Sequence, residues 1–95
     1  MSNSLPAGKR LLVIIPAYNE EASLARVIAN VKTALPHADI VVINDGSHDS
    51  TGHVGGLAGA YVITLPYNLG IGAAVQTGFI FARDNGYDFT VQVDG

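Results

Sequence analysis

Four side chains in this sequence have the chemistry to bind a nucleotide and a metal ion. Tyr18 and Glu20 follow the first apolar run of the chain, Asp45 follows the second, and Asp94 follows the last. A phenol ring offers a flat apolar face to a base, and a carboxylate accepts hydrogen bonds from ribose hydroxyls or base N–H groups. Carboxylate oxygen is also the ligand that hard divalent cations prefer. These residues are remote in the chain, so only the fold can bring them together.

Short apolar runs rich in Val and Ile predict buried strands of a parallel sheet. They cover residues 10–15, 39–44, 60–65 and 88–93, and stretches with helical spacing separate them. Strands that alternate with helices imply parallel pairing through right-handed crossovers. The expected fold class is therefore α/β, with the arrangement of one half of a doubly wound sheet.

The helical stretches differ in how clearly they are marked. The first has an apolar stripe made by Leu24, Val27, Ile28, Val31 and Leu35. The second has four glycines within residues 51–59 and is expected to be short or irregular. The third is expected from about Ile71 to Asp84. Its packed side would consist of Ile71, Ala74, Val75, Gly78, Phe79 and Ala82.

Polar and aromatic residues follow each predicted strand, at the edge where open α/β sheets bind their ligands. Pro16 is expected to end the pairing of the first strand. Each acid also has a structural alternative. Glu20 and Glu21, with Asn19 as a cap, could complement the dipole of the first helix, and Asp49 could cap the second. We favour ligand contact for Tyr18, Glu20 and Asp45, and capping for Asp49.

Composition restricts the class of protein. The chain has 95 residues, which is enough for one modest core, so residues 9–95 are interpreted as one unit after a loose leader at residues 1–8. A net charge of −3 offers no basic surface for nucleic acid. The absence of cysteine excludes disulfides and thiolate metal sites, and the three histidines are interpreted as surface residues. No apolar run is long enough to span a membrane.

Four segments together resemble the family 2 glycosyltransferases. They are "VIIPAYNEE", "VVINDGSHDST", "LPYNLGIGAAVQTGF" and "VQVDG", in the family's order and at its spacing. The third is most similar to the polyprenyl-phosphate and dolichol-phosphate sugar transferases. The resemblance implies the N-terminal, nucleotide-binding half of a GT-A fold: a three-layer α/β/α sandwich with a mainly parallel sheet in the order 3-2-1-4. It also implies a location in the cytoplasm or at the cytoplasmic face of a membrane.

The resemblance further implies which residues bind the donor nucleotide. They are Pro16, Ala17, Tyr18, Glu20, Ile43, Asp45, Asp94 and Gly95. Asn44 stands where the family often has a second aspartate, and Ile71 stands where relatives often have a lysine. The donor would be a UDP-, GDP- or dTDP-sugar, and a lipid phosphate of the polyprenyl type is a candidate acceptor. The general base cannot be assigned from these residues.

Asp94 resembles the first aspartate of the family's DXD motif, which holds Mg²⁺ or Mn²⁺ against the donor's diphosphate. The sequence stops at Gly95, before the second acid of that motif. We therefore interpret the chain as a fragment of a metal-dependent transferase that does not turn over alone, with weak nucleotide binding that metal improves little. An uncovered sheet edge at the last strand predicts self-association.

Three other nucleotide-binding functions occur in proteins of related architecture. A sugar-nucleotide nucleotidyltransferase is expected to have a glycine-rich, arginine-containing loop after the first strand, and residues 16–20 do not provide one. A dinucleotide-binding enzyme should have G-x-G-x-x-G there; the partial match at Gly70 and Gly72 follows a later strand and ends in Val75. A non-catalytic nucleotide-binding module stays open as an alternative.

Overall fold

The computed structural model describes residues 7–94, so most of the predicted leader and Gly95 lie outside the described residues. Strands and helices alternate along the chain, as the sequence predicts. In chain order they are β1 (Leu11–Ala17), α1 (Leu24–Ala34), β2 (Asp39–Asn44), α2 (Thr51–Leu57), β3 (Tyr61–Thr64), α3 (Ile71–Asp84) and β4 (Phe89–Gln92). Within this part of the chain, no helix combines the length and the apolar character needed to cross a bilayer.

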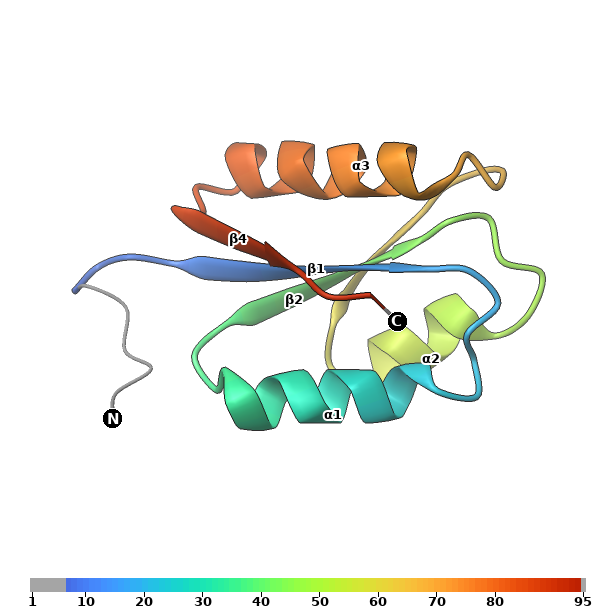
Figure 1. Cartoon of the computed structure of the whole chain (residues 1–95), viewed down its shortest axis with the longest axis horizontal. Helices are drawn as coiled ribbons and strands as arrows, with labels where there is room; N and C mark the ends of the chain where they lie inside the picture. Colours follow the sequence, from blue (N-terminus) through green and yellow to red (C-terminus); the bar gives the residue numbers. More distant parts are fainter. Residues whose placement is uncertain (1–6, 95) are drawn as a thin grey trace.

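The strands form one parallel sheet in the order β3-β2-β1-β4. Helices α1 and α2 cover one face and α3 covers the other, which gives three layers (Figure 1). The predicted α/β class, the layering and the strand order are therefore confirmed. Because all strands run in the same direction, their carboxyl ends, and the loops that follow them, lie at one rim of the sheet.

Strand β1 forms the centre of the core. On one face, Val13 and Ile15 pack in a buried cluster with Leu24 and Ile28 of α1. On the other face, Leu12 and Ile14 lie in a cluster with Ala74 and Ala82 of α3. Full burial of an aliphatic side chain of this size stabilises a fold by about 1.5–3 kcal/mol. This double coverage explains the continuous apolar run and makes β1 the strand that fixes the rest of the sheet.

Pro16 does not end β1, contrary to the prediction. The strand continues to Ala17 and pairs with β2 through Pro16↔Ile43 and Ala17↔Asn44. Backbone groups of alternate residues point to the same side of a strand, and the carbonyl of Ile14 faces β4, where it accepts the N–H of Val93. Pro16 therefore also faces that side, where pairing with β4 has already ended at Ile14. The missing proline N–H costs no ladder hydrogen bond there.

The helix boundaries correct two other predictions. Helix α1 begins at Leu24 with Ser23 as its N-cap, and its first turn contains no acidic residue. The acids at 20 and 21, and Asn19, therefore precede the helix and do not cap it. Helix α2 is short, as its glycines predict. The bounds of α3 are as predicted, but only Ala74, Gly78 and Ala82 of its expected packed side are buried, whereas Ile71 and Phe79 are exposed.

The opposite rim of the sheet, at the amino ends of the strands, is closed by side chains. The hydroxyl of Tyr87 donates to Oδ2 of Asp39 at 2.5 Å, and the guanidinium of Arg10 lies 4.1 Å from the centroid of the Tyr87 ring. Burial and then the Asp39 carboxylate raise the pKa of Tyr87 to about 12. These contacts join the start of β4 to the starts of β1 and β2.

Gly78 lets α3 approach the sheet closely. A Cβ atom at this position would lie 2.5 Å from Cγ2 and 2.9 Å from Cδ1 of Ile14, a fully buried side chain in the middle of β1. Gly72, in the same helix, has no atom near the equivalent position. The two glycines therefore separate the effect of packing from the effect of helix propensity.

We predict that Gly78→Ala lowers the free energy of unfolding by about 1–3 kcal/mol, because overpacking outweighs the gain in helix propensity. Gly72→Ala, the control, is expected to raise it by a few tenths to about 1 kcal/mol. Urea denaturation followed by circular dichroism measures both. Equal stabilisation by the two alanines would contradict this packing of α3 against β1.

Candidate functional site

A cavity of about 240 Å³ opens at the carboxyl rim of the sheet. It is lined by Pro16, Ala17, Tyr18, Glu20, Asp45, Asn68, Gly70 and Ile71. The first five of these residues belong to the set that the sequence assigns to a donor nucleotide. Asn68 and Gly70 come from the loop between β3 and α3, and Ile71 is the first residue of α3. Three loops that are distant in the chain therefore form one pocket, which we call the rim pocket.

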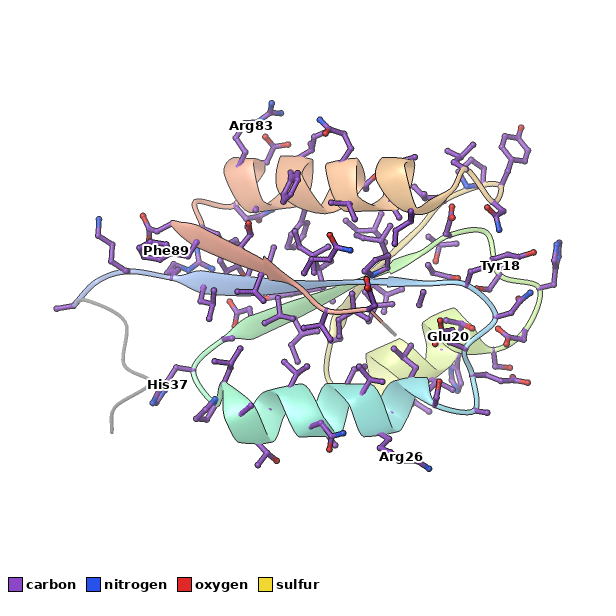
Figure 2. The ribbon with its side chains drawn as sticks, viewed as in Figure 1. Tyr18, Glu20, Arg26, His37, Arg83 and Phe89 are labelled. Carbon is purple, nitrogen blue, oxygen red and sulfur yellow. The ribbon has the colours of Figure 1, made fainter. Side chains whose placement is uncertain are left out.

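The loop after β1 presents an aromatic ring and a carboxylate beside each other (Figure 2). Ala17 is buried at the strand end, whereas Tyr18 is 40% exposed, so part of its ring is free to meet a ligand. Glu20 is half-buried, and its Oε2 accepts a hydrogen bond from Ser23 Oγ at 3.3 Å. This single, long contact leaves most of the acceptor capacity of Glu20 available in the pocket.

Asp45 has a different environment, because its carboxylate is buried and already bonded. Its Oδ1 accepts the N–H of Leu69 at 2.8 Å, and its Oδ2 accepts the N–H of Gly70 at 2.9 Å. The side chain therefore fixes the loop that precedes α3 as a wall of the rim pocket. A carboxylate with these bonds still has lone pairs for a ligand, so it can hold the wall and contact a base at the same time.

Gly46 brings the same two loops together. Its φ of +70° favours glycine, and an added Cβ would lie 2.3 Å from the carbonyl carbon of Tyr67. The neighbouring Asn44 has a structural role: its Nδ2 donates to Thr64 Oγ1 at 3.3 Å, and its Oδ1 accepts the N–H of Ser47 at 3.3 Å. An amide, unlike a carboxylate, can make both bonds.

Reciprocal hydrogen bonds tie the loop after β1 to the loop after β2. Asn19, with φ +52°, donates its N–H to Ser47 Oγ, and its Oδ1 accepts the N–H of His48 at 2.9 Å. The N–H of Glu20 donates to Oγ1 of the fully buried Thr51 at 2.8 Å. These bonds explain the polar residues after Pro16: Asn19 orients the loop, so that Tyr18 and Glu20 lie at the pocket.

Asp49 lies one residue before Ser50, the N-cap of α2, and its side chain accepts the first N–H of the helix rather than acting as the cap itself. It accepts the N–H of Thr51 at 2.9 Å and that of Glu21 at 3.3 Å, and Thr51 Oγ1 also donates to it. Glu21 in turn accepts the N–H of Ser50 at 3.0 Å. The hydrogen bond from the Thr51 hydroxyl is the main reason why the pKa of Asp49 is below its ordinary value.

The structure does not bring the other predicted site residues into the rim pocket. Ile43 has a fully buried side chain in the core, and Gly95 is outside the described residues. Asp94 is exposed and lies in a separate groove of about 360 Å³ beside α1, where its Oδ1 accepts a hydrogen bond from Gln92. The register Ile14↔Gln92 places Asp94 toward the same rim as Tyr18, but not in the same cavity.

The described residues do not complete a metal centre. Among residues 7–94 there is no group of three or more His, Cys, Asp or Glu side chains that could hold a cation. Asp94 supplies one carboxylate, whereas Mg²⁺ takes six ligands in near-octahedral geometry. Asp94 alone therefore does not complete the coordination of the expected cation, and the remaining ligands would have to come from outside the described residues, such as the donor's diphosphate.

A larger hollow of about 410 Å³ lies at the opposite rim, lined by Lys32, Ala38, Asp39, Ile40, Gly59, Ala60 and Tyr61. It is formed by the amino ends of β2 and β3, where open parallel sheets rarely bind ligands. Lys32 Nζ already donates to the carbonyl of Ala58 at 2.7 Å. The amino-rim hollow is larger, but the rim pocket is the better candidate for a ligand site, because polar side chains from separate loops converge there.

Sequence reasoning missed the contribution of the third loop. Asn68, Gly70 and Ile71 line the rim pocket, although only side chains after the first, second and fourth strands were assigned to it. Asn68 follows the third predicted strand, so its position was a usable signal. The two hydrogen bonds that Asp45 accepts from backbone N–H groups have no such signal in the sequence, because almost any residue type offers an N–H.

Known proteins are similar in sequence to most of this chain. Residues 12–91 match the family model described as glycosyl transferase family 2. The chain is 34% identical over 90 residues to undecaprenyl-phosphate mannosyltransferase of Micrococcus luteus, covering 90% of this chain and 37% of the relative. It is 38% identical over 92 residues to polyprenol monophosphomannose synthase of Mycolicibacterium smegmatis, covering 90% of this chain and 35% of the relative. The chain thus spans about a third of the length of these relatives.

A solved structure shares the fold. Glucosyl-3-phosphoglycerate synthase from Mycobacterium tuberculosis, in complex with Mn²⁺, UDP-glucose and phosphoglyceric acid, matches with a TM-score of 0.75 and 28% sequence identity. The match covers 93% of this chain and 33% of the synthase. The GT-A arrangement predicted from the sequence is therefore confirmed.

We predict that Asp45→Asn lowers the free energy of unfolding by about 1–3 kcal/mol, because the amide offers one acceptor for two N–H groups and turns an N–H₂ toward the other. The amides of Leu69 and Gly70 should also lose protection from hydrogen exchange. The control is Asp84→Asn, at an exposed position on α3. Unchanged protection of both amides in Asp45→Asn would show that the carboxylate does not hold the loop.

Asp49 should make stability depend on acid pH. Because its pKa is lower in the folded state, its contribution is complete above the unfolded carboxyl pKa of about 3.9 and is lost as the pH falls through the lower folded value. Asp49→Asn should remove this part of the decline. Urea midpoints measured from pH 5 to pH 2 test it, and an identical decline in both proteins would contradict the assignment.

Proposed function

Since the chain belongs to glycosyl transferase family 2, we propose that the rim pocket binds the nucleotide of a nucleotide-sugar donor. The observation that supports this most is the meeting of Pro16, Ala17, Tyr18, Glu20 and Asp45 in one cavity. The resemblance in sequence assigns all five of them to the donor nucleotide. Their convergence at the carboxyl rim is what an α/β nucleotide site requires.

Each lining group has a use toward a nucleoside. The exposed part of the Tyr18 ring offers an apolar face to a base. Glu20 accepts hydrogen bonds from ribose hydroxyls or base N–H groups, and Asn68 can both donate and accept. The pocket volume of about 240 Å³ is below the roughly 300–1,000 Å³ usual for ligand sites. It therefore suits base and ribose, with diphosphate and sugar extending outward.

The reaction of the whole protein is proposed from its relatives. Two of them are named for sugar transfer to undecaprenyl phosphate or polyprenol phosphate, so a polyprenyl phosphate is the proposed acceptor. An acceptor oxygen would form a bond to the anomeric carbon as the bond to the nucleoside diphosphate breaks. In that step the described residues bind and orient the donor. None of them is assigned as a general base for the acceptor.

A divalent cation remains part of the proposal for the whole protein, because the similar synthase was solved with Mn²⁺. Such an ion would neutralise the charge that develops on the leaving diphosphate. Asp94 is the one described residue proposed to contact it. We also propose that the protein acts in the cytoplasm or at the cytoplasmic face of a membrane, since its relatives are named for lipid acceptors.

Self-association through the edge of the sheet is a further part of the proposal. Among the described residues, β4 pairs only with β1, and its Phe89 and Val91 side chains are exposed. Exposed strand edges of this kind invite pairing between chains. Light scattering over a range of concentrations tests this, and a monomer at the highest concentration would contradict it.

We predict that UDP, GDP or dTDP binds this chain and that Tyr18→Ala and Glu20→Gln each weaken binding about five- to fiftyfold, which corresponds to roughly 1–2.3 kcal/mol. Isothermal titration calorimetry measures the affinity. The control is Tyr61→Ala, which removes an exposed ring at the amino rim. Equal losses in the control and in Tyr18→Ala, with both variants folded, would contradict the assignment of the site.

The same titration, run with Mn²⁺ and with EDTA, measures how much a divalent cation changes nucleotide affinity. With Asp94 as the one described carboxylate near the expected cation, Mn²⁺ should change the affinity of this chain by no more than about threefold. Asp94→Asn should abolish even that small change without altering binding in EDTA. A strong dependence on Mn²⁺ that survives Asp94→Asn would place the cation elsewhere.

A further inference from the structure

Three large apolar side chains project from the loop that forms one wall of the rim pocket. Tyr67, Leu69 and Ile71 are 70%, 55% and 59% exposed, and we call these three residues the apolar tip. They lie where the chain leaves β3 and enters α3, at the end of α3 nearest the carboxyl rim (Figure 1). Ile71 also lines the pocket. Exposed apolar residues grouped in this way mark a contact surface more often than isolated ones do.

The sequence around the apolar tip has no formal charge. From Ser50 to Ala82 there is no Asp, Glu, Lys or Arg, although 13 such residues occur in the chain. Side chains without formal charge can leave water without the large cost of desolvating an ion, and the nearest carboxylates, Glu20 and Asp45, lie inside the rim pocket that Ile71 lines. The tip therefore suits an apolar partner and not one that is recognised through charge.

Two backbone N–H groups at the apolar tip already have hydrogen-bond partners inside the protein. The N–H groups of Leu69 and Gly70 are bonded to the buried Asp45, and Asn68 Oδ1 also accepts the N–H of Gly70. Loops that enter a lipid environment need such internal partners, because lipid tails offer none. The same bonds hold the loop in one conformation, so docking would cost little conformational entropy.

We propose that the apolar tip docks into the interfacial layer of a lipid bilayer, with the mouth of the rim pocket held at the membrane surface. This inference rests on the proposed function, because a lipid phosphate acceptor has its phosphate in that layer. Tyrosine is favoured at membrane interfaces, where its ring is buried and its hydroxyl is wet. The tip would thus set the distance between the donor and the acceptor's headgroup.

The charge distribution determines which membranes should bind. All Lys and Arg residues lie outside residues 50–82, and the net charge is −3, so no basic surface near the tip would attract anionic lipids. Binding should therefore depend on apolar burial. It should be similar for phosphatidylcholine and for mixtures with phosphatidylglycerol, and it should persist in high salt, which screens only electrostatic attraction.

The test is flotation of the purified chain with phosphatidylcholine vesicles. It is run at low salt and in about 0.5 M NaCl, where the Debye length is roughly 4 Å and electrostatic attraction is screened. The variant Tyr67→Ser/Leu69→Ser alters the tip without touching a side chain that lines the rim pocket. We expect it to lower the partition coefficient about tenfold or more. The matched control, Leu57→Ser/Phe79→Ser, removes one exposed aliphatic and one exposed aromatic side chain elsewhere on the surface, at 76% and 46% exposure.

Calorimetry with the nucleotide runs in parallel, so the two proposals can fail separately. Nucleotide binding without vesicle binding would overturn the membrane contact and leave the proposed function intact. Equal losses in the tip variant and in the control would also overturn it, as would binding that requires anionic lipid and vanishes in salt. If the tip variant instead changes the oligomeric state in light scattering while vesicle binding stays the same, the tip is a protein contact.

Discussion

The hydrogen bonds between the buried carboxylate of Asp45 and two backbone N–H groups hold the candidate site together. Burying a carboxylate is costly unless its oxygens are bonded, and here both oxygens accept N–H groups of the loop before α3. The contact joins the end of β2 to the beginning of α3, across the position where β1 delivers Tyr18 and Glu20. Without it, the rim pocket would lose one wall and the apolar tip would lose its fixed orientation.

Most of the fold could be predicted because the apolar pattern follows the layers directly. Strand β2 and helix α3 have the predicted bounds, since β2 is buried on both faces and α3 ends at clear stop signals. Two predictions were wrong for reasons that involve neighbouring strands and close packing. Pro16 stays within β1 because β4 no longer pairs at that level. Phe79 is exposed because α3 packs on Ile14 through the narrow stripe of Ala74, Gly78 and Ala82, and Phe79 lies beside that stripe.

The candidate site could be predicted only in part. Side chains that bind ligands directly, such as Tyr18 and Glu20, have a chemical signature and a position after a strand. Residues that act through the backbone do not, so the loop network around Asn19 and Thr51 appeared first in the structure. Asp94 has the residue type expected of a cation ligand, and the register places it toward the predicted rim, but it lies in a groove beside α1 and not in the rim pocket.

The central claim is that nucleotides bind in the rim pocket and not in the larger hollow at the amino rim. The most direct measurement is a titration of the ¹⁵N-labelled chain with UDP and GDP, followed by NMR chemical shifts of the backbone amides. Binding in the rim pocket predicts chemical-shift changes at the amides of residues 17–20, of Asp45 and of residues 68–71. The amides of Lys32, Asp39 and Tyr61 should change little. Shifts centred on those last three residues, with the carboxyl rim unaffected, would contradict it.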